Sequence, residues 1–152
     1  MIIKDKLTAN IPGTATFVDK YDVLSGIVGA ESVFAGQLVD IDKVLKDGVI
    51  EKATAATKRA GVVVHQQVKP TTAEEQKTIQ TFKSGEVAGV CIRGFILAVA
   101  HKDDNGSSLK LENNEIKHDG SVDLALATNI ILTGKSQLVD KYDKKVVEVE
   151  VK

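Results

Sequence analysis

The sequence contains no tryptophan, one cysteine and two prolines, and aromatic residues make up only 4% of its 152 positions. A single cysteine excludes an intramolecular disulfide, which fits a protein made in a reducing cytoplasm. Because aromatic side chains are scarce, the core has to be built from β-branched and small aliphatic residues, and these favour sheet. Scarce aromatics also argue against an adhesive module that stacks sugars on rings.

The sequence also lacks an excess of charge of either sign and any long apolar run. Its 20 basic and 21 acidic residues leave a formal net charge of -1, whereas a nucleic-acid site needs concentrated positive charge. No segment approaches the roughly 18 apolar residues of a membrane span, and the start, MIIKDKLTAN, places charges where a signal peptide needs its apolar centre. We therefore expect a soluble protein with no nucleic-acid and no membrane partner.

What the sequence does contain is a series of β-branched runs separated by turn residues. Asp47–Gly48 predicts a turn that leads into a strand, and residues 60–65, AGVVVH, form a short β-branched run. Residues 85–100, GEVAGVCIRGFILAVA, are apolar on both faces of an extended chain, so we expect them to lie between two packed layers. The final KKVVEVEVK predicts a half-buried strand, with Val147, Val149 and Val151 on one face and Glu148 and Glu150 on the other.

The predicted fold class is mainly β: a compact β-sandwich or small β-barrel with at most one or two short helices and an extended N-terminal arm. One helix is indicated within residues 71–82, TTAEEQKTIQTF, where Thr72 and Glu75 have the spacing of a capping box. Residues 36–42, GQLVDID, are predicted as strand. This length suits one domain, so we assign residues 1–16 to the arm and residues 17–152 to a single β domain.

The single cysteine, Cys91, lies inside the longest apolar run and has two interpretations. A nucleophilic cysteine needs a pKa lowered by a cation, a histidine or a helix start in an accessible cleft. Arg93, His65 and His101 carry suitable groups, but nothing in the sequence places them against the sulfur. A lone thiol in an apolar strand behaves as a small hydrophobic residue, so packing is favoured, and we predict no catalytic residue and no enzyme activity.

Two groups of polar residues are candidates for a metal site. Asp103, Asp104 and Asn105 offer oxygen ligands, but the residues after them do not supply the ordered oxygen series of a calcium loop, and a solvated hairpin loop is favoured. His101 and His118 have no cysteine partners, which makes a zinc site weak. We predict no metal and no cofactor.

A pair of carboxylates is the remaining candidate for acid–base chemistry. Asp40 and Asp42 stand at strand spacing on one face, but the adjoining Lys43 and Lys46 favour a solvated edge. The sequence also has no complete phosphate-binding loop, nucleophile elbow or dinucleotide fingerprint. No enzyme class therefore has residues to support it.

The order of four segments is more informative than any single motif: Gly36–Val39, Ala60–His65, Gly85–Ala100 and the terminal VVEVEV. Together, over about residues 10–151, they resemble the small capsid decoration proteins of tailed bacteriophages, also called cement or head-stabilising proteins. The resemblance implies a compact β fold that assembles as a homo-oligomer, with a trimer favoured. It also implies a non-enzymatic protein, made in the host bacterial cytoplasm, that binds the outside of an assembled capsid and ties neighbouring major capsid proteins together.

Other functions stay open beside that one. Another phage structural component, such as a head-fibre base, a tail tube or an adaptor, is the nearest alternative. A ligand-binding or adhesive β module is the more distant one.

The candidate partner-binding residues lie in two segments. An extended arm can add a strand to a neighbour's sheet edge, and its contact residues would be Ile2, Ile3, Leu7, Ile11 and Pro12; a frayed terminus is an equal alternative. In the glycine-rich segment LSGIVGAESVFAG, Val33 and Phe34 are candidates for covering a partner subunit, although ordinary core burial is favoured there.

Overall fold

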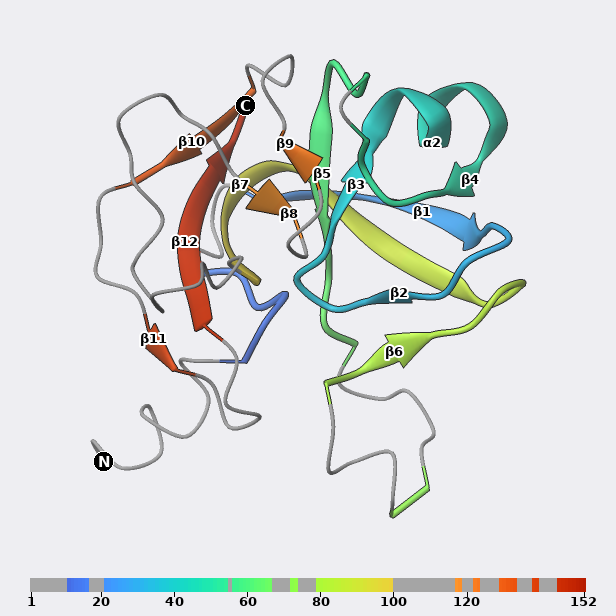
Figure 1. The fold of residues 1–152 in the computed structure, drawn as a ribbon, viewed down its shortest axis with the longest axis horizontal. Coiled ribbons are helices and arrows are strands. Elements are labelled where there is room, and N and C mark those ends of the chain that lie inside the picture. Colours follow the sequence, from blue (N-terminus) through green and yellow to red (C-terminus); the bar gives the residue numbers. More distant parts are fainter. Residues whose placement is uncertain are drawn as a thin grey trace.

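The fold is organised around one long strand, β7, which is paired along both of its edges. The computed structural model describes residues 11–16, 21–54, 56–66, 72–73, 79–99, 117–118, 122–123, 129–133, 138–139 and 145–152. Its elements in chain order are β1 (Asp22–Val28), β2 (Val33–Phe34), β3 (Leu38–Asp40), α2 (Ile41–Asp47), β4 (Val49–Ile50), β5 (Ala60–Val63), β6 (Thr81–Phe82), β7 (Val87–Val99), β8 (Lys117–His118), β9 (Val122–Asp123), β10 (Ile130–Leu132), β11 (Leu138–Val139) and β12 (Lys145–Val151). Strands predominate and the described residues contain one helix, which confirms the mainly β prediction (Figure 1).

The two halves of β7 belong to different parts of the sheet. Val87–Arg93 pairs with β1, and within it Val90–Cys91 pairs with β5 on the other edge. Gly94–Val99 pairs with β12, which carries β10 and β11 on its far side. Gly94 has a φ of 130°, a conformation that favours glycine, so the bend occurs where the pairing changes. The sheet consequently curls into a nearly closed barrel, and Figure 1 shows β7 curving between β1 and β12.

The described part of the expected arm, residues 11–16, lies along the second half of β7. The Gly13 N–H donates to the Leu97 carbonyl (2.8 Å), and the Gly13 carbonyl accepts from the His65 N–H (2.9 Å). A Cβ at Gly13 would lie 2.7 Å from the His65 nitrogen, so this close approach requires glycine. Residues 11–16 are therefore hydrogen-bonded into the barrel, and residues 1–10 lie outside the described residues.

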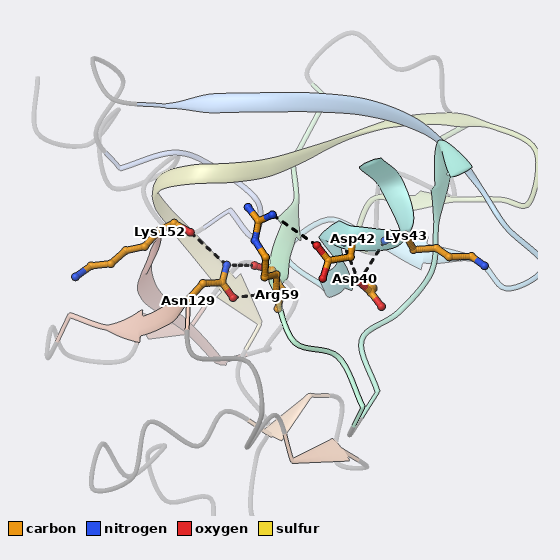
Figure 2. A network of polar contacts seen from close by, with 7 residues as sticks. Asp40, Asp42, Lys43, Arg59, Asn129 and Lys152 are labelled. Atoms are coloured by element: carbon orange, nitrogen blue, oxygen red, sulfur yellow. Dashed lines mark hydrogen bonds and ion pairs between the residues drawn. The ribbon is translucent and has the colours of Figure 1, made fainter. Parts of the chain in front are cut away.

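Helix α2 occupies a place where the sequence predicted strand. The Asp40 carboxylate accepts from the backbone N–H groups of Asp42 (3.0 Å) and Lys43 (3.3 Å), which caps the helix start (Figure 2). Gly48 ends the helix in the left-handed conformation, and its N–H donates to the Val44 carbonyl. The predicted turn at Gly48 is confirmed. The strand prediction is wrong after Asp40, and so is the placement of the Asp40 and Asp42 carboxylates on one strand face.

The helix predicted within residues 71–82 is wrong at its C-terminal end. Thr81–Phe82 forms β6, which pairs with β2. Phe82 is fully buried in the core, so tertiary packing opposite Val33 sets the local conformation. Glu75, the second residue of the expected capping box, lies outside the described residues.

Two hydrophobic cores lie on opposite sides of β5 and β7. Neighbouring residues of these strands alternate between them: Val62 and Cys91 belong to the first core, Val63 and Val90 to the second. The other members of the first core are Leu38, Ile41, Ala53, Ala60, Ile96, Ala98, Ile130, Val149 and Val151. Those of the second are Val28, Val33, Ala35, Val39, Val44, Ile50, Phe82 and Ala88. The prediction that β7 lies between two packed layers is confirmed for its central part.

The terminal strand β12 is more buried than its alternating pattern predicted. Val149 and Val151 are buried as expected, but Glu148 is only 6% exposed and Val146 is fully buried. The reason is the position of β12, which has β7 on one edge and β10 and β11 on the other. The prediction of a half-buried strand is therefore wrong at Glu148.

The side chain of Asn129 joins two strands that do not pair with each other. Its Oδ1 accepts from the Ala60 N–H (2.9 Å) and its Nδ2 donates to the Ala60 carbonyl (2.8 Å). Its Nδ2 also lies 3.5 Å from the Lys152 carbonyl oxygen (Figure 2), and its backbone carbonyl accepts from the Lys152 N–H (2.9 Å), directly after β12. Ala60 is the first residue of β5. The carboxamide therefore supplies hydrogen bonds at the point where the partner of β7 changes from β5 to β12, and where β5 and β12 do not pair with each other.

Candidate functional site

Strands β4, β1 and β7 lie side by side (Figure 1), and no described element covers one face of the sheet there. The register aligns Val49, Ile27 and Val87 in one row across these strands. In the next row Ser25 lies opposite Gly89, whose carbonyl accepts from the Val64 N–H beyond β5 (2.9 Å). We call the surface formed by Val23, Ser25, Ile27, Val49, Val64, Val87 and Gly89 the open face.

The open face is apolar and accessible. Val23, Ile27 and Val87 are 42%, 52% and 61% exposed, although they occupy the middle of paired strands. None of its seven residues carries a charge. Isolated exposed apolar residues are ordinary, but a contiguous group on one sheet face is typical of a surface that another molecule covers.

A shallow hollow lies in the open face above Gly89. Its volume is about 230 Å³, and the residues that line it are Ser25, Val64, His65, Gln66, Val87, Ala88 and Gly89. Gly89 has no side chain, and a Cβ there would lie 3.0 Å from Val23 Cγ1 and 3.7 Å from Val64 Cβ. The backbone of Gly89 therefore forms the floor of the hollow. Pockets for small-molecule ligands usually exceed about 300 Å³, so the hollow suits a single apolar side chain better than a cofactor.

Among the described residues, nothing pairs with part of the outer edge of β1 beside the open face. The Val28 N–H donates to Glu86 of the chain leading into β7, so in this strand the backbone groups of even-numbered residues face β7. Those of Val23 and Ser25 therefore face the opposite edge. There β4 pairs only with Ile27 and Val28, and no described residue is recorded as a partner for Val23 or Ser25.

Cys91 is fully buried in the first core, which confirms the packing interpretation. Burial raises the pKa of its thiol to about 11, and the thiol donates to the Arg93 carbonyl (3.4 Å). Tyr21 packs against the same core, and burial, together with the proximity of Cys91, raises the pKa of its phenol to about 12. Both groups are therefore neutral at physiological pH, and the thiol lacks the lowered pKa that a nucleophile needs.

The predicted partner-binding residues do not gather on one described surface. Val33 is 1% exposed in the second core, so the core-burial alternative holds for it, and Phe34 is partly buried beside it. Pro12 is buried, and its Cβ lies against Gly36. Ile11 is partly exposed. The other three candidates, Ile2, Ile3 and Leu7, lie outside the described residues.

The metal candidates are placed only in part. His101, Asp103, Asp104 and Asn105 lie outside the described residues, and His118 is in β8 with its side chain not described. Within the described ranges, no group of three or more His, Cys, Asp or Glu side chains is arranged to hold a metal ion. No helix in the part of the chain that the structure describes has the length and apolar character needed to cross a membrane.

Sequence reasoning missed the residues of the open face and Asn129. Val23 and Ile27 sit in a run, VLSGIV, that is apolar on both strand faces, which by itself predicts burial. Comparison of the chain with family models, curated proteins and solved structures found no match. Among the described residues, the exposed apolar side chains and the hollow above Gly89 make the open face our candidate site.

Proposed function

We propose that this chain is a non-enzymatic virion structural protein that binds the outside of an assembled phage capsid and stabilises contacts between major capsid proteins. The resemblance of four sequence segments to capsid decoration proteins suggests this function. The observation in the structure that supports it is the open face, an uncharged sheet surface whose large exposed apolar residues are Val23, Ile27 and Val87. The protein acts as a homo-oligomer, with a trimer favoured.

The physical demands of this function match the kind of surface observed. A decoration protein needs no chemistry; it needs a rigid surface that forms modest contacts at many equivalent capsid positions. Contacts made by linked copies add through effective concentration, so each single contact is allowed to be weak. The strands that display the open face are pinned by β5 and by the second core, which keeps the surface fixed before binding.

Co-sedimentation with undecorated capsid shells tests the proposal. The purified protein is mixed with shells, the shells are pelleted and the bound ratio is measured. We expect saturable binding at a ratio set by capsid symmetry, and weakening of about tenfold or more for the double variant Ile27→Lys/Val87→Lys. Leu45→Lys is the matched control, because Leu45 is 56% exposed on α2 and lies outside the open face.

Three outcomes count against the proposal. Absence of binding to intact, unoccupied shells overturns the capsid-decoration function and favours a tail, head-fibre or adhesive function. Equal binding by the double variant and the Leu45→Lys control removes the open face from the contact. Equal binding to free capsid subunits shows that the assembled lattice is not what the protein recognises.

A further inference from the structure

We infer that one side of the barrel is a cooperative unit that opens while the rest of the chain stays folded. The unit consists of residues 11–16, the second half of β7 (Gly94–Val99) and strands β10, β11 and β12, and we call it the closing unit. The body consists of β1 to β6, α2 and the first half of β7. The opening involves no capsid, so this inference holds or fails independently of the proposed function.

The two parts differ in the hydrophobic core that each one owns. Every member of the second core lies in the body, between Val28 and Val90. The core residues of the closing unit, from Ile96 to Val151, all belong to the first core, which the unit shares with the body. When the closing unit opens, the body therefore keeps one complete core, whereas the unit keeps none.

Strand ladders hold the closing unit together internally. Strand β12 pairs with β7 from Gly94 to Val99 along one edge and with β10 and β11 along the other. Residues 13–16 bond to the same half of β7 through the backbone groups of Phe95 and Leu97. These strands share their hydrogen bonds, so we expect them to open together.

Four hydrogen bonds between described residues join the closing unit to the body, at two separate places. On one side of the barrel, the Asn129 carboxamide bonds to the N–H and the carbonyl of Ala60. On the other side, the His65 N–H donates to the Gly13 carbonyl (2.9 Å), and the Val99 N–H donates to the Gly36 carbonyl (2.9 Å). The boundary is thus joined at single points, whereas each part is joined by ladders.

The boundary crosses β7 at Gly94. Its φ of 130° is a conformation that side chains rarely allow, so the bend is fixed at this residue. The partners of β7 change at the same place, from β1 and β5 before Gly94 to β12 from Gly94 onward. Figure 1 shows β7 curving between the two groups of strands.

The open face lies entirely on the body. Its large exposed residues, Val23, Ile27 and Val87, are in β1 and in the first half of β7. The second core lies behind these strands and does not include the closing unit. Opening of the closing unit therefore leaves the open face in place, and the barrel can loosen on one side without loss of that surface.

Native-state hydrogen exchange in low urea concentrations tests this opening. The closing-unit reporters are the N–H groups of Leu97 and Val99, which donate to Thr14 and Gly36. The body reporters are those of Val63 and Val64, which donate to carbonyls within the body. After correction for intrinsic rates, we expect the closing-unit reporters to exchange about tenfold or more faster, because only the body reporters require global unfolding.

A matched pair of variants separates partial opening from global unfolding. Ile50→Val and Ile130→Val each remove one methylene from a buried isoleucine, in the second and the first core respectively. Ile50→Val should speed exchange of the body reporters about two- to tenfold and leave the closing-unit reporters unchanged, because the second core stays intact in the partial opening. Ile130→Val should speed exchange of all four reporters, because its packing is lost in both events.

Contrary results are clear for each measurement. Equal exchange of all four reporters in the wild type would mean that the chain unfolds as one unit, which overturns the inference. The inference is also overturned if Ile50→Val speeds both pairs of reporters equally, or if Ile130→Val leaves the closing-unit reporters unchanged. Circular dichroism checks that each variant is folded, and Val44→Ala, at a 5% exposed residue of the second core, is a second variant with the same expected result as Ile50→Val.

Discussion

Replacing Asn129 by alanine removes the carboxamide that links the start of β5 to the end of β12. The two hydrogen bonds to Ala60 are 2.9 and 2.8 Å long, within the ordinary range for N–H···O bonds. Ala60 itself is fully buried. The substitution therefore leaves the N–H and the carbonyl of a buried residue without their partner.

The expected loss follows from what is left unsatisfied. A hydrogen bond contributes about 0.5–1.5 kcal/mol net, whereas each buried group left unpaired costs about 1–3 kcal/mol. Partial solvation after the truncation lowers the sum, because Asn129 is only partly buried. We expect Asn129→Ala to lower the free energy of unfolding by about 2–4 kcal/mol, which for a chain of this length corresponds to a fall in Tm of about 5–15 °C.

Urea denaturation at neutral pH measures this loss directly, and Thr133→Ala is the control. Thr133 ends the same strand region, but its Oγ1 lies 3.4 Å from the Glu148 carbonyl, too far for a strong hydroxyl bond, so we expect it to cost under about 0.5 kcal/mol. The m-value should stay unchanged in both variants. If Asn129→Ala costs less than about 1 kcal/mol, or no more than the control, the carboxamide does not close the barrel.

The remaining predictions concern pH, the thiol and two glycines. Asn129→Asp keeps the oxygen that accepts from the Ala60 N–H but places a second carboxylate oxygen against the Ala60 carbonyl, which raises the pKa of the new carboxyl above about 3.9. This variant should be most stable below pH 4 and should lose stability as the pH rises through the raised pKa. Urea titrations at several pH values measure this. Because Cys91 is buried, it should react with thiol reagents only after unfolding, and rapid labelling of the native protein would contradict this. Burial raises the pKa of its thiol to about 11, so the stability of the wild type should fall between about pH 9 and 11 more steeply than that of Cys91→Ser. At neutral pH the substitution itself should cost about 1–2 kcal/mol. Gly61→Ala places a Cβ 2.7 Å from the Cys91 carbonyl oxygen and should cost about 2–3 kcal/mol in thermal melts, whereas Gly89→Ala meets only movable side-chain atoms and should cost under about 1 kcal/mol; equal losses would contradict the contact geometry.

Strands with a strong local pattern were predictable from the sequence. The valine run of β5 and the long, mostly apolar run of β7 predict strands buried on both faces, and the structure confirms this for their central residues. The bend at Gly94 follows a general rule, since a glycine inside a strand often marks a kink or a close approach.

Helix α2 was missed because β-branched residues mask its cap. Val39 and Ile41 favour strand on either side of Asp40, and a strand does end at Asp40. The signal that would have located the helix is the combination of Asp40 as a capping residue with Gly48 at the other end. Ile41 and Val44 then have the spacing of one buried helix face.

The candidate site and the closure of the barrel depend on contacts that no local pattern contains. Asn129 and Ala60 are 69 residues apart, and an asparagine after a threonine carries no signal for a partner at that distance. The register between β1 and β7 likewise decides that Ile27 meets Val87. Such pairings are set by the whole fold, so single-sequence patterns cannot supply them.

Val33 and Ile27 differ in how far the described part of the chain covers them. Both are aliphatic residues in strands, yet Val33 is 1% exposed opposite Phe82 of β6, whereas Ile27 is 52% exposed. Exposed sheet edges are usually protected by lysine, proline or a bulge that turns the edge away. Along Val23–Ile27 no lysine or proline is present, and the recorded irregularity lies at the Asp22 end of the strand. The open face therefore lies beside an edge without the usual protection, and what binds the face should bring aliphatic side chains.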